Sequence, residues 1–390
     1  MRLAAIADSV YGLRMTKNAI LLVVSSLLGF FFCELMFRQL PVAQKLGWNL
    51  VPPIAERLAD YRSAGADKTT TTLLAIGDSF TVFRDTQNEN YIRFAARDLE
   101  AQGARIRTFN LAEPGTGVDR YLNNFCAALQ QRKPDIVVFG IYFGNDIRGY
   151  QHVRQTPACK IAVDPDSHTV KALLKQSLLI NTAFRLLKVY VPALRSGQYE
   201  MVRDYMGQQN GLTPAEVAAG EKRIPADLVE GAKADTVNGW DVAAAIAEPE
   251  YFTRISAEPE GTFAEDIALL ADDLAGANHD CAAAGIHCLF VILPVAPWVS
   301  ANAQYYYERM GQTVRGLEQG EPPSLTAMIS ALEARQVPLL NALPALRRHA
   351  DETLFIEQDT HLNIQGQEIV GTALGERLSA LGWIGKTAKP

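Results

Sequence analysis

The hydrophobic pattern changes its period repeatedly between residue 71 and the C-terminal part of the chain. Short continuous apolar runs, which are typical of strands buried on both faces, are followed by longer stretches with apolar residues at helical spacing. The predicted strands span residues 72–77, 106–111, 135–142, 287–294 and 337–341. The predicted helices span residues 89–102, 121–129, 262–284, 324–335 and 364–381. This alternation predicts an α/β fold, a three-layer α/β/α sandwich with a five-stranded parallel sheet.

The alternation is interrupted over residues 148–258, where helical patterns are separated by polar loops. The clearest helical pattern covers residues 170–194. Farther along, Thr213-Pro-Ala-Glu216 has the residues of a capping box, with proline at the first helical position. We interpret the stretch as a helical insertion into one domain that spans residues 71–385.

An apolar segment near the N-terminus, residues 19–37, predicts a membrane anchor. At ~1.5 Å per residue the segment approaches the ~30 Å thickness of a bilayer core, and its single charge is Glu34. Arg2, Arg14 and Lys17 precede it, which favours a cytoplasmic N-terminus. A cleaved signal peptide and a buried core helix are the alternatives. We expect an uncleaved anchor in a bacterial inner membrane, with the remaining chain on the periplasmic side.

Residues 38–70 are predicted as a linker between the anchor and the domain. They contain Pro41, the pair Pro52-Pro53, one short possible helix and a run of threonines. The expected order along the chain is therefore a cytoplasmic segment over residues 1–18, the anchor, the linker and the α/β domain with its insertion.

The composition is that of an ordinary globular protein, with 48% hydrophobic and 21% charged residues. The formal net charge is -6, and lysine and arginine form no block. A nucleic-acid partner would require a concentrated basic face, because binding depends on displacing counterions from phosphates. The composition therefore argues against a nucleic-acid partner, and it leaves protein partners undetermined.

Five cysteines are present, at positions 33, 126, 159, 281 and 288. Cys33 lies in the predicted anchor, and the other four can pair in an oxidising compartment. Cys281 with Cys288 and Cys126 with Cys159 form one of three possible pairings. No spacing of cysteine and histidine indicates a metal site.

The residues that follow the predicted strands are the candidates for chemistry, because ligands bind at the carboxyl ends of the strands in such sheets. Gly77-Asp78-Ser79 follows the first strand. A serine at a strand-to-helix turn exposes its hydroxyl, and its backbone N–H lies near a helix N-terminus that favours negative charge. The alternative is that Asp78 or Ser79 only caps the helix.

A glycine and an asparagine follow the second and third strands. Gly115 allows a backbone N–H to approach a substrate closely. Asn145, in the run Gly144-Asn145-Asp146, can donate two hydrogen bonds into the crevice. The plainer alternatives are a glycine-rich turn and an Asx turn.

His361 follows the last predicted strand and precedes the last predicted helix. A histidine supplies a base that titrates near neutral pH, and Asp359, two residues earlier, can fix its tautomer. The alternative is a helix cap beside a surface histidine.

Together these positions, each at a strand end and in this order, make the chain resemble the SGNH/GDSL hydrolase family, which has a flavodoxin-like fold. The family's four blocks match Gly77-Asp78-Ser79, Gly115, Gly144-Asn145-Asp146, and the pair Asp359 and His361. The resemblance covers residues 71–147 and 259–383, and it leaves out the anchor, the linker and most of the insertion.

The spacing of the acid departs from the commonest family pattern, which places it three residues before the histidine. That position is Gln358 in this chain. Asp359 is two residues before His361, as in relatives that resemble alginate acetylation proteins. We therefore assign the acid to Asp359, with Glu357 as the alternative.

The resemblance implies a serine esterase that works through an acyl-enzyme intermediate and needs no metal or organic cofactor. Ser79 would be the nucleophile, His361 the general base and Asp359 the residue that orients the base. The backbone N–H groups of Ser79 and Gly115 and the side-chain amide of Asn145 would form the oxyanion hole.

The expected substrate is an O-acyl ester of a cell-envelope carbohydrate, most simply an O-acetyl group, because the predicted location is periplasmic. Trp298 and the run Tyr305-Tyr306-Tyr307 follow the fourth strand, and their aromatic faces can stack on sugar rings or pack within the fold. Asp78, Phe80 and Asp146 are further candidates for substrate contacts.

Three other functions share the same sequence features. An O-acyltransferase would pass the acyl group from the serine to an envelope polysaccharide. A lipid esterase or thioesterase would suit a position at the membrane. A non-catalytic polysaccharide-binding scaffold is disfavoured, because the full set of catalytic residue types is present.

Overall fold

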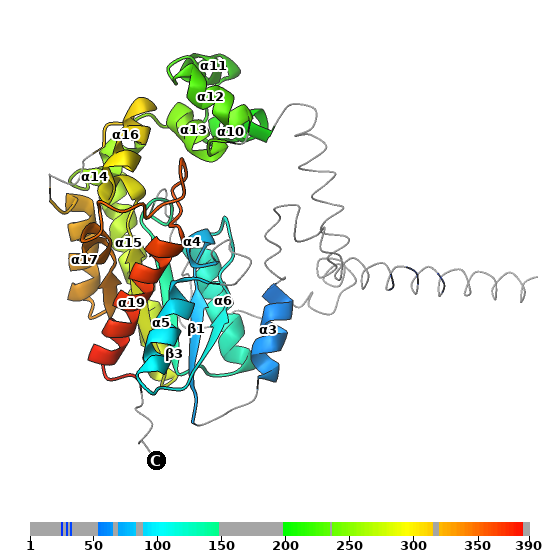
Figure 1. The fold of residues 1–390 in the computed structure, drawn as a ribbon, viewed down its shortest axis with the longest axis vertical. Helices are drawn as coiled ribbons and strands as arrows, with labels where there is room; N and C mark the ends of the chain where they lie inside the picture. Colours follow the sequence, from blue (N-terminus) through cyan, green and yellow to red (C-terminus); the bar gives the residue numbers. More distant parts are fainter. Residues whose placement is uncertain are drawn as a thin grey trace, which may run out of the picture. The chain divides into compact units, whose positions relative to one another are not determined.

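A five-stranded parallel sheet forms the centre of the described part of the chain (Figure 1). The computed structural model describes residues 25, 29, 32, 54–64, 69–82, 89–147, 198–234, 236–314 and 320–384. The strands are β1 (Thr71–Ile76), β2 (Ile106–Asn110), β3 (Ile136–Tyr142), β4 (His287–Leu293) and β5 (Leu339–Asn341), in the order β2-β1-β3-β4-β5. The α/β fold with a five-stranded parallel sheet is confirmed.

The central strands are buried on both faces, which explains their continuous apolar sequence. Every residue of β3 is buried, and β3 pairs in parallel with β1 on one side and β4 on the other. Strand β5 is shorter than predicted. Its first predicted residues include Pro338, which has no N–H to donate to a ladder, although its carbonyl accepts from the Phe290 N–H at 3.0 Å.

The helices that follow the strands lie on both faces of the sheet. They are α4 (Ser79–Val82), α5 (Tyr91–Ala101), α6 (Val118–Gln131), α15 (Gly261–Ala283), α16 (Ala301–Arg309), α17 (Pro323–Ala334), α18 (Leu343–Arg347) and α19 (Ile364–Ala380), with a 3₁₀ turn over Ala296–Trp298. Helices α5 and α19 pack side by side, and α15 packs on α17 and β4 (Figure 1). The step from β1 to β2 runs along the sheet in the opposite direction to the steps from β3 to β4 and β5, so right-handed connections are expected to put α5 on the face opposite to α15 and α17.

The segment predicted as an insertion is helical in its described part. It contains α10 (Gln198–Gln209), α11 (Pro214–Glu221), α12 (Ala226–Lys233), α13 (Gly239–Ala247) and α14 (Tyr251–Ser256). The predicted capping box is confirmed: Thr213 accepts from the Glu216 N–H, and the Glu216 carboxylate accepts from the Thr213 N–H. The helical pattern predicted over residues 170–194 lies outside the described residues.

The stretch predicted as a linker contains a helix that belongs to the fold. Helix α3 (Ile54–Ser63) packs on α6, and Tyr61 is fully buried. The Arg57 guanidinium donates to the carbonyls of Asn110 and Ala112 at 2.9 and 2.8 Å. Residues 54–63 are therefore built into the domain, and a linker over the whole of 38–70 is corrected. The sequence signal was weak because α3 has a small apolar face.

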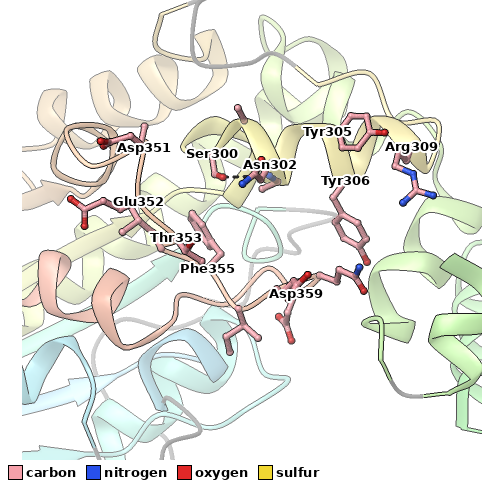
Figure 2. A pocket seen from close by; sticks show the side chains of 17 residues that line it. Ser300, Asn302, Tyr305, Tyr306, Arg309, Asp351, Glu352, Thr353, Phe355 and Asp359 are labelled. Atoms are coloured by element: carbon pink, nitrogen blue, oxygen red, sulfur yellow. Dashed lines mark hydrogen bonds between the residues drawn. The ribbon is translucent and has the colours of Figure 1, made fainter. Parts of the chain in front are cut away.

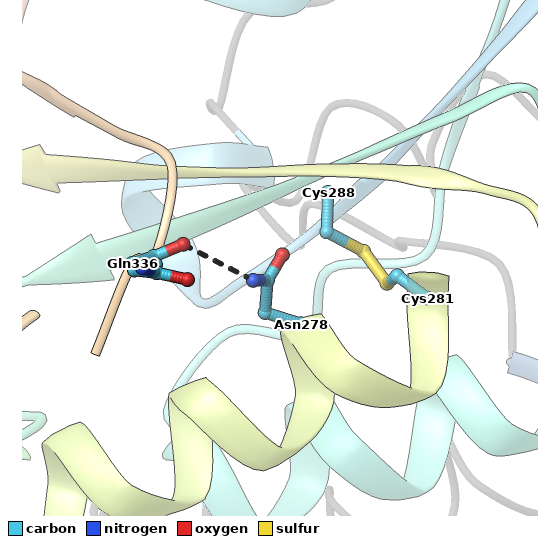
Figure 3. The surroundings of a disulfide bond; sticks show 4 residues. All are labelled: Asn278, Cys281, Cys288 and Gln336. Carbon is cyan, nitrogen blue, oxygen red and sulfur yellow. Dashed lines mark hydrogen bonds between the residues drawn. A yellow bond between two sulfur atoms is a disulfide. The ribbon is translucent and has the colours of Figure 1, made fainter. Parts of the chain in front are cut away.

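A disulfide joins Cys281 at the end of α15 to Cys288 in β4, with their Cα atoms 6.0 Å apart (Figure 3). It closes the short turn between the helix and the strand, so this predicted pair is confirmed. The other predicted pair includes Cys159, which lies outside the described residues.

The predicted membrane anchor, residues 19–37, lies outside the described residues apart from Ser25, Gly29 and Phe32. Among the helices that the structure describes, none combines the length and the apolar composition required to span a bilayer.

Candidate active site

The nucleophile candidate begins the short helix α4 directly after β1. Gly77 turns the chain there, and a Cβ at this position would collide with the side chain of Thr81 and approach the carbonyl of Gly140. Only glycine therefore allows α4 to start this close to the sheet. Ser79 is half-buried at the start of that helix, whose next three residues are buried.

Ser79, His361 and Asp359 are joined by a continuous chain of hydrogen bonds. The His361 Nε2 lies 2.8 Å from the Ser79 Oγ, and the His361 Nδ1 lies 2.6 Å from the Asp359 Oδ1. The same carboxylate oxygen accepts from the His361 backbone N–H at 2.9 Å, so the acid is fixed at two points. The His361 and Asp359 side chains are 15% and 14% exposed. This geometry matches a nucleophile, a base and the residue that orients the base.

The loop that carries the acid and the base has a defined backbone. Phe355 and Leu362 form an isolated antiparallel bridge, and the Ile356 N–H donates to the His361 carbonyl at 2.9 Å. Gln358 adopts a positive φ of 55°, which turns the chain immediately before Asp359. Among the described residues, Asp359 bonds to His361, whereas Glu357, the alternative acid, makes no hydrogen bond to it.

The predicted oxyanion residue Asn145 is held by Asp78. The Asn145 Nδ2 donates to the Asp78 Oδ2 at 3.0 Å, and the Asp78 Oδ1 accepts from the Phe80 N–H at 2.9 Å. An amide nitrogen carries two hydrogens, so Asn145, which is exposed, keeps one for a ligand. Burial raises the pKa of Asp78, and the bonds from Asn145 and Phe80 oppose that rise.

Gly115 lies in the loop after β2, which is tied to the turn that carries the serine. The Glu113 N–H donates to the Gly77 carbonyl at 2.9 Å, and the Asn110 side chain donates to the Thr81 carbonyl at 2.8 Å. Gly115 is exposed and has a positive φ of 69°, a conformation that favours glycine. The two loops are therefore fastened side by side at the carboxyl end of the sheet.

Three residues that the sequence analysis proposed for substrate contacts are buried. Asp78, Phe80 and Asp146 are at most 3% exposed. Asp146 accepts from the Tyr121 hydroxyl at 3.0 Å and from the Tyr142 N–H at 2.9 Å. Burial and the neighbouring Asp78 raise the pKa of Asp146 well above its usual range. These buried side chains contact and position other residues of the site and are not exposed to a substrate.

Phe80 supports the base through ring contacts. Its ring stacks on the His361 imidazole, with 4.4 Å between centroids, and on the Tyr142 ring at 3.5 Å. The imidazole is thereby held between an aromatic face and the Asp359 carboxylate.

Trp298 is not a substrate contact, which corrects the sequence prediction. It is fully buried, its Nε1 donates to the Ser256 Oγ at 2.9 Å, and its ring packs on Phe143. Of the three tyrosines in α16, Tyr305 is 65% exposed, whereas Tyr306 and Tyr307 are buried. Sequence alone did not separate them, because exposure depends on which face of α16 packs inward.

Two supporting residues were missed by the sequence analysis. Gln367 of α19 is buried; its Oε1 accepts from the Tyr91 N–H at 3.0 Å and its Nε2 donates to the Phe80 carbonyl at 3.3 Å. It thus links the helix after His361 to the helix that begins at Ser79. Asp241 of α13 belongs to the insertion, and its carboxyl group is near enough to Asp359 for that charge to raise its pKa. A polar residue within an apolar helical stripe was the only sequence signal for Gln367.

Asp241 has an unusual environment for a carboxyl group. Its Oδ2 is buried and has no hydrogen-bond partner within the described residues. Burial and the neighbouring Asp359 raise its pKa well above the usual range, and Tyr307 opposes that rise. Next to it, the Asn238 N–H donates to the Gln358 carbonyl at 3.2 Å. The N-terminal end of α13 is therefore in direct contact with the loop that carries the acid.

In the described part of the chain, histidine, cysteine and carboxylate side chains form no cluster suited to a metal ion. The chemistry available at the site is that of the hydroxyl, imidazole, carboxylate and amide groups described above.

No family model and no curated protein sequence matches this chain. Several solved structures are similar to it. A lipase/acylhydrolase from Enterococcus faecalis is 10% identical with a TM-score of 0.37, over 82% of this chain and all of that one. TesA is 12% identical with a TM-score of 0.35, over 80% of this chain and 99% of that one. A candidate lipolytic protein of the G-D-S-L family from Desulfitobacterium hafniense DCB-2 is 12% identical with a TM-score of 0.34, over 79% of this chain and 99% of that one.

Proposed function

We propose that this protein is a serine ester hydrolase of the SGNH/GDSL type that removes O-acyl groups, most simply O-acetyl groups, from a cell-envelope carbohydrate. The observation that carries the proposal is the hydrogen-bond chain from the Ser79 hydroxyl through His361 to Asp359. A serine hydroxyl is a weak nucleophile by itself, and a histidine at 2.8 Å is the means by which it loses its proton during attack. The closer resemblance to alginate acetylation proteins stays a prediction.

The reaction would proceed in two halves. In the first, the Ser79 Oγ attacks the ester carbonyl, its proton passes to the His361 Nε2, and the departing alcohol takes that proton as the ester bond breaks. In the second, a water gives its proton to His361 and attacks the acyl-serine, which releases the carboxylic acid and restores the serine. Asp359 stabilises the imidazolium in both halves.

The negative charge on the carbonyl oxygen would be met by three donors. These are the backbone N–H groups of Ser79 and Gly115 and the remaining N–H of the Asn145 amide. The bond from Asn145 to Asp78 fixes the amide before substrate arrives. Donors that are already in place need no reorganisation when the charge develops, which is the main source of their effect.

The proposal is tested with a fluorophosphonate probe, which reacts with activated serines. We expect the full-length chain to be labelled, Ser79→Ala to lose labelling, and His361→Ala to be labelled far more slowly. Ser63→Ala removes an exposed serine of α3 and serves as the matched control, with labelling equal to the parent. Labelling that survives in Ser79→Ala, or a folded parent that is never labelled, would reject the proposal.

We also propose that the domain lies on the periplasmic side of a bacterial inner membrane, held by residues 19–37. The apolar segment with its preceding basic residues supports this location, and so does the disulfide between Cys281 and Cys288, because disulfides persist in oxidising compartments. Protease added to intact spheroplasts should degrade the domain. Protection until the cells are lysed would contradict the location.

A further inference from the structure

A cavity of about 690 Å³ lies between α16 and residues 350–359 (Figure 2). Asp359 lines the cavity, and its carboxylate also bonds to His361. Because only the width of the imidazole separates that carboxylate from the Ser79 hydroxyl, a ligand in the cavity would lie beside the reacting ester. The proposed catalytic residues do not account for this space.

The strongest indication of a ligand is Tyr306. Its side chain points from α16 toward the segment that carries Asp359 (Figure 2), and the residue is 9% exposed. Its hydroxyl is buried and has no hydrogen-bond partner in the described part of the chain. A buried polar group without a partner is destabilising, so this hydroxyl, on a residue that lines the cavity, indicates a partner that enters from the cavity.

The exposed groups around the cavity suit a saccharide. Tyr305 offers a ring that is 65% exposed, and an aromatic face can pack on the C–H face of a sugar. Asn302 and the carboxylates of Asp351 and Glu357 can bond to hydroxyl groups. Phe355 also lines the cavity but is 6% exposed, since most of its ring packs in the core. Ile356, which is 37% exposed, and three alanines also line the cavity, so its wall is apolar in part.

The charges select among saccharides. Among the described residues, four carboxylates line the cavity, at positions 351, 352, 357 and 359, and one guanidinium does, that of Arg309. The Arg309 Nη2 is already bonded to the Asp227 carboxylate at 2.6 Å. A polymer of uronic acids would therefore meet like charge over the whole subsite, whereas uncharged or amino sugars would not.

We propose that this cavity is a saccharide subsite beside the triad, selective for neutral or amino sugars over uronic-acid polymers. The proposal rests on the proposed esterase function, which it deepens by naming the sugar class. Tyr305 provides the stacking face, Tyr306 a hydrogen bond from the wall, and the carboxylates the selection by charge.

The test measures binding of unacetylated hexasaccharides to the full-length chain by calorimetry, with cellohexaose, a glucosamine hexamer and a mannuronate hexamer as probes. We expect the first two to bind and the third to bind at least about tenfold more weakly. Tyr305→Ala should weaken cellohexaose binding about fivefold to tenfold, the effect typical of one aromatic contact. Tyr306→Phe should weaken it about fivefold through the lost hydrogen bond.

Tyr205→Ala is the matched control, because Tyr205 is a 50% exposed tyrosine of α10 that does not line the cavity. It should bind all three probes as the parent does, and a thermal melt of each variant should show that it is folded. The double variant Asp351→Asn with Glu357→Gln should reduce the preference for cellohexaose over the mannuronate hexamer at least threefold. High salt should also reduce this preference in the parent, because salt, like the double variant, weakens the repulsion between the cavity carboxylates and the mannuronate hexamer.

The subsite is refuted if neither cellohexaose nor the glucosamine hexamer binds, if Tyr305→Ala loses no more affinity than Tyr205→Ala, or if the mannuronate hexamer binds as tightly as cellohexaose. Hydrolysis of 4-nitrophenyl acetate by the parent tests the esterase function separately. An active esterase that binds no hexasaccharide would reject the subsite alone, whereas specific saccharide binding without esterase activity would reject the esterase function alone.

Discussion

At the scale of single residues, buried carboxyl groups organise the site more than exposed ones do. Asp78 orients Asn145, and Asp146 holds Tyr121 together with the end of β3. Both are acidic residues within predicted catalytic blocks, and for that reason their sequence positions suggested substrate contacts. Their burial shows that they act on neighbouring side chains, because a carboxyl group that no solvent or ligand reaches can interact only within the protein.

Asn145→Ala tests the oxyanion role at this scale. The variant removes an exposed amide, so it should fold as the parent does, while turnover of 4-nitrophenyl acetate falls by ~10²–10³. Stopped-flow or steady-state kinetics would measure the loss in kcat. Turnover within threefold of the parent would show that Asn145 does not stabilise the intermediate.

Asp241→Asn tests the buried carboxyl of the insertion through the pH dependence of stability. Folding raises the pKa of Asp241, so the folded state binds the proton more tightly than the unfolded state does. The folded state therefore loses stability as the pH rises above the pKa that the group has in the unfolded chain. An amide in its place removes this penalty. We expect the variant to have a higher Tm than the parent at pH 8 and a smaller difference in Tm at pH 4. Each kcal/mol of added stability should raise the Tm by about 2–4 °C. An equal difference at both pH values would contradict a raised pKa.

At the scale of elements, two helices hold the loop that carries Asp359 and His361. Helix α19 is joined to the start of α4 through Gln367, and α13 is joined to the loop through the bond from the Asn238 N–H to the Gln358 carbonyl. The insertion therefore does more than border the site. It contacts the backbone immediately before the acid, at the residue with positive φ.

Asn238→Pro tests this contact between elements. Asn238 has a φ of -63°, which suits proline, so the change removes the N–H that donates to Gln358 with little backbone conflict. Displacement of the loop should lower kcat about tenfold or more, because small misplacements of catalytic groups are costly. Asn238→Ser keeps the N–H and can still cap α13, so it should retain near-parent activity. Equal kcat values for the two variants would show that the bond does not position the loop.

At the scale of the whole molecule, the sheet brings distant loops to one edge. The loops after β1, β2, β3 and β5 supply Ser79, Gly115, Asn145 and the pair Asp359 and His361. Bonds between these loops and their supporting helices make them one unit. The saccharide subsite adds α16 to this edge, so the residues after β4 also take part in the proposed function.

Sequence patterns alone were enough to predict the α/β alternation, the five strands, the capping box at Thr213 and the strand-end residues. These features depend on local periods and turn chemistry, and the strand-end rule follows from the parallel topology that the periods imply. The folded structure was needed to show that Trp298 is buried while Tyr305 is exposed, that α3 packs into the domain, and that the charge of Asp359 acts on Asp241. The burial of a side chain and the charges near it depend on which elements pack against it in space. Residues that are far apart in the chain, such as Asp241 and Asp359, share no periodic pattern that would reveal their proximity in the sequence.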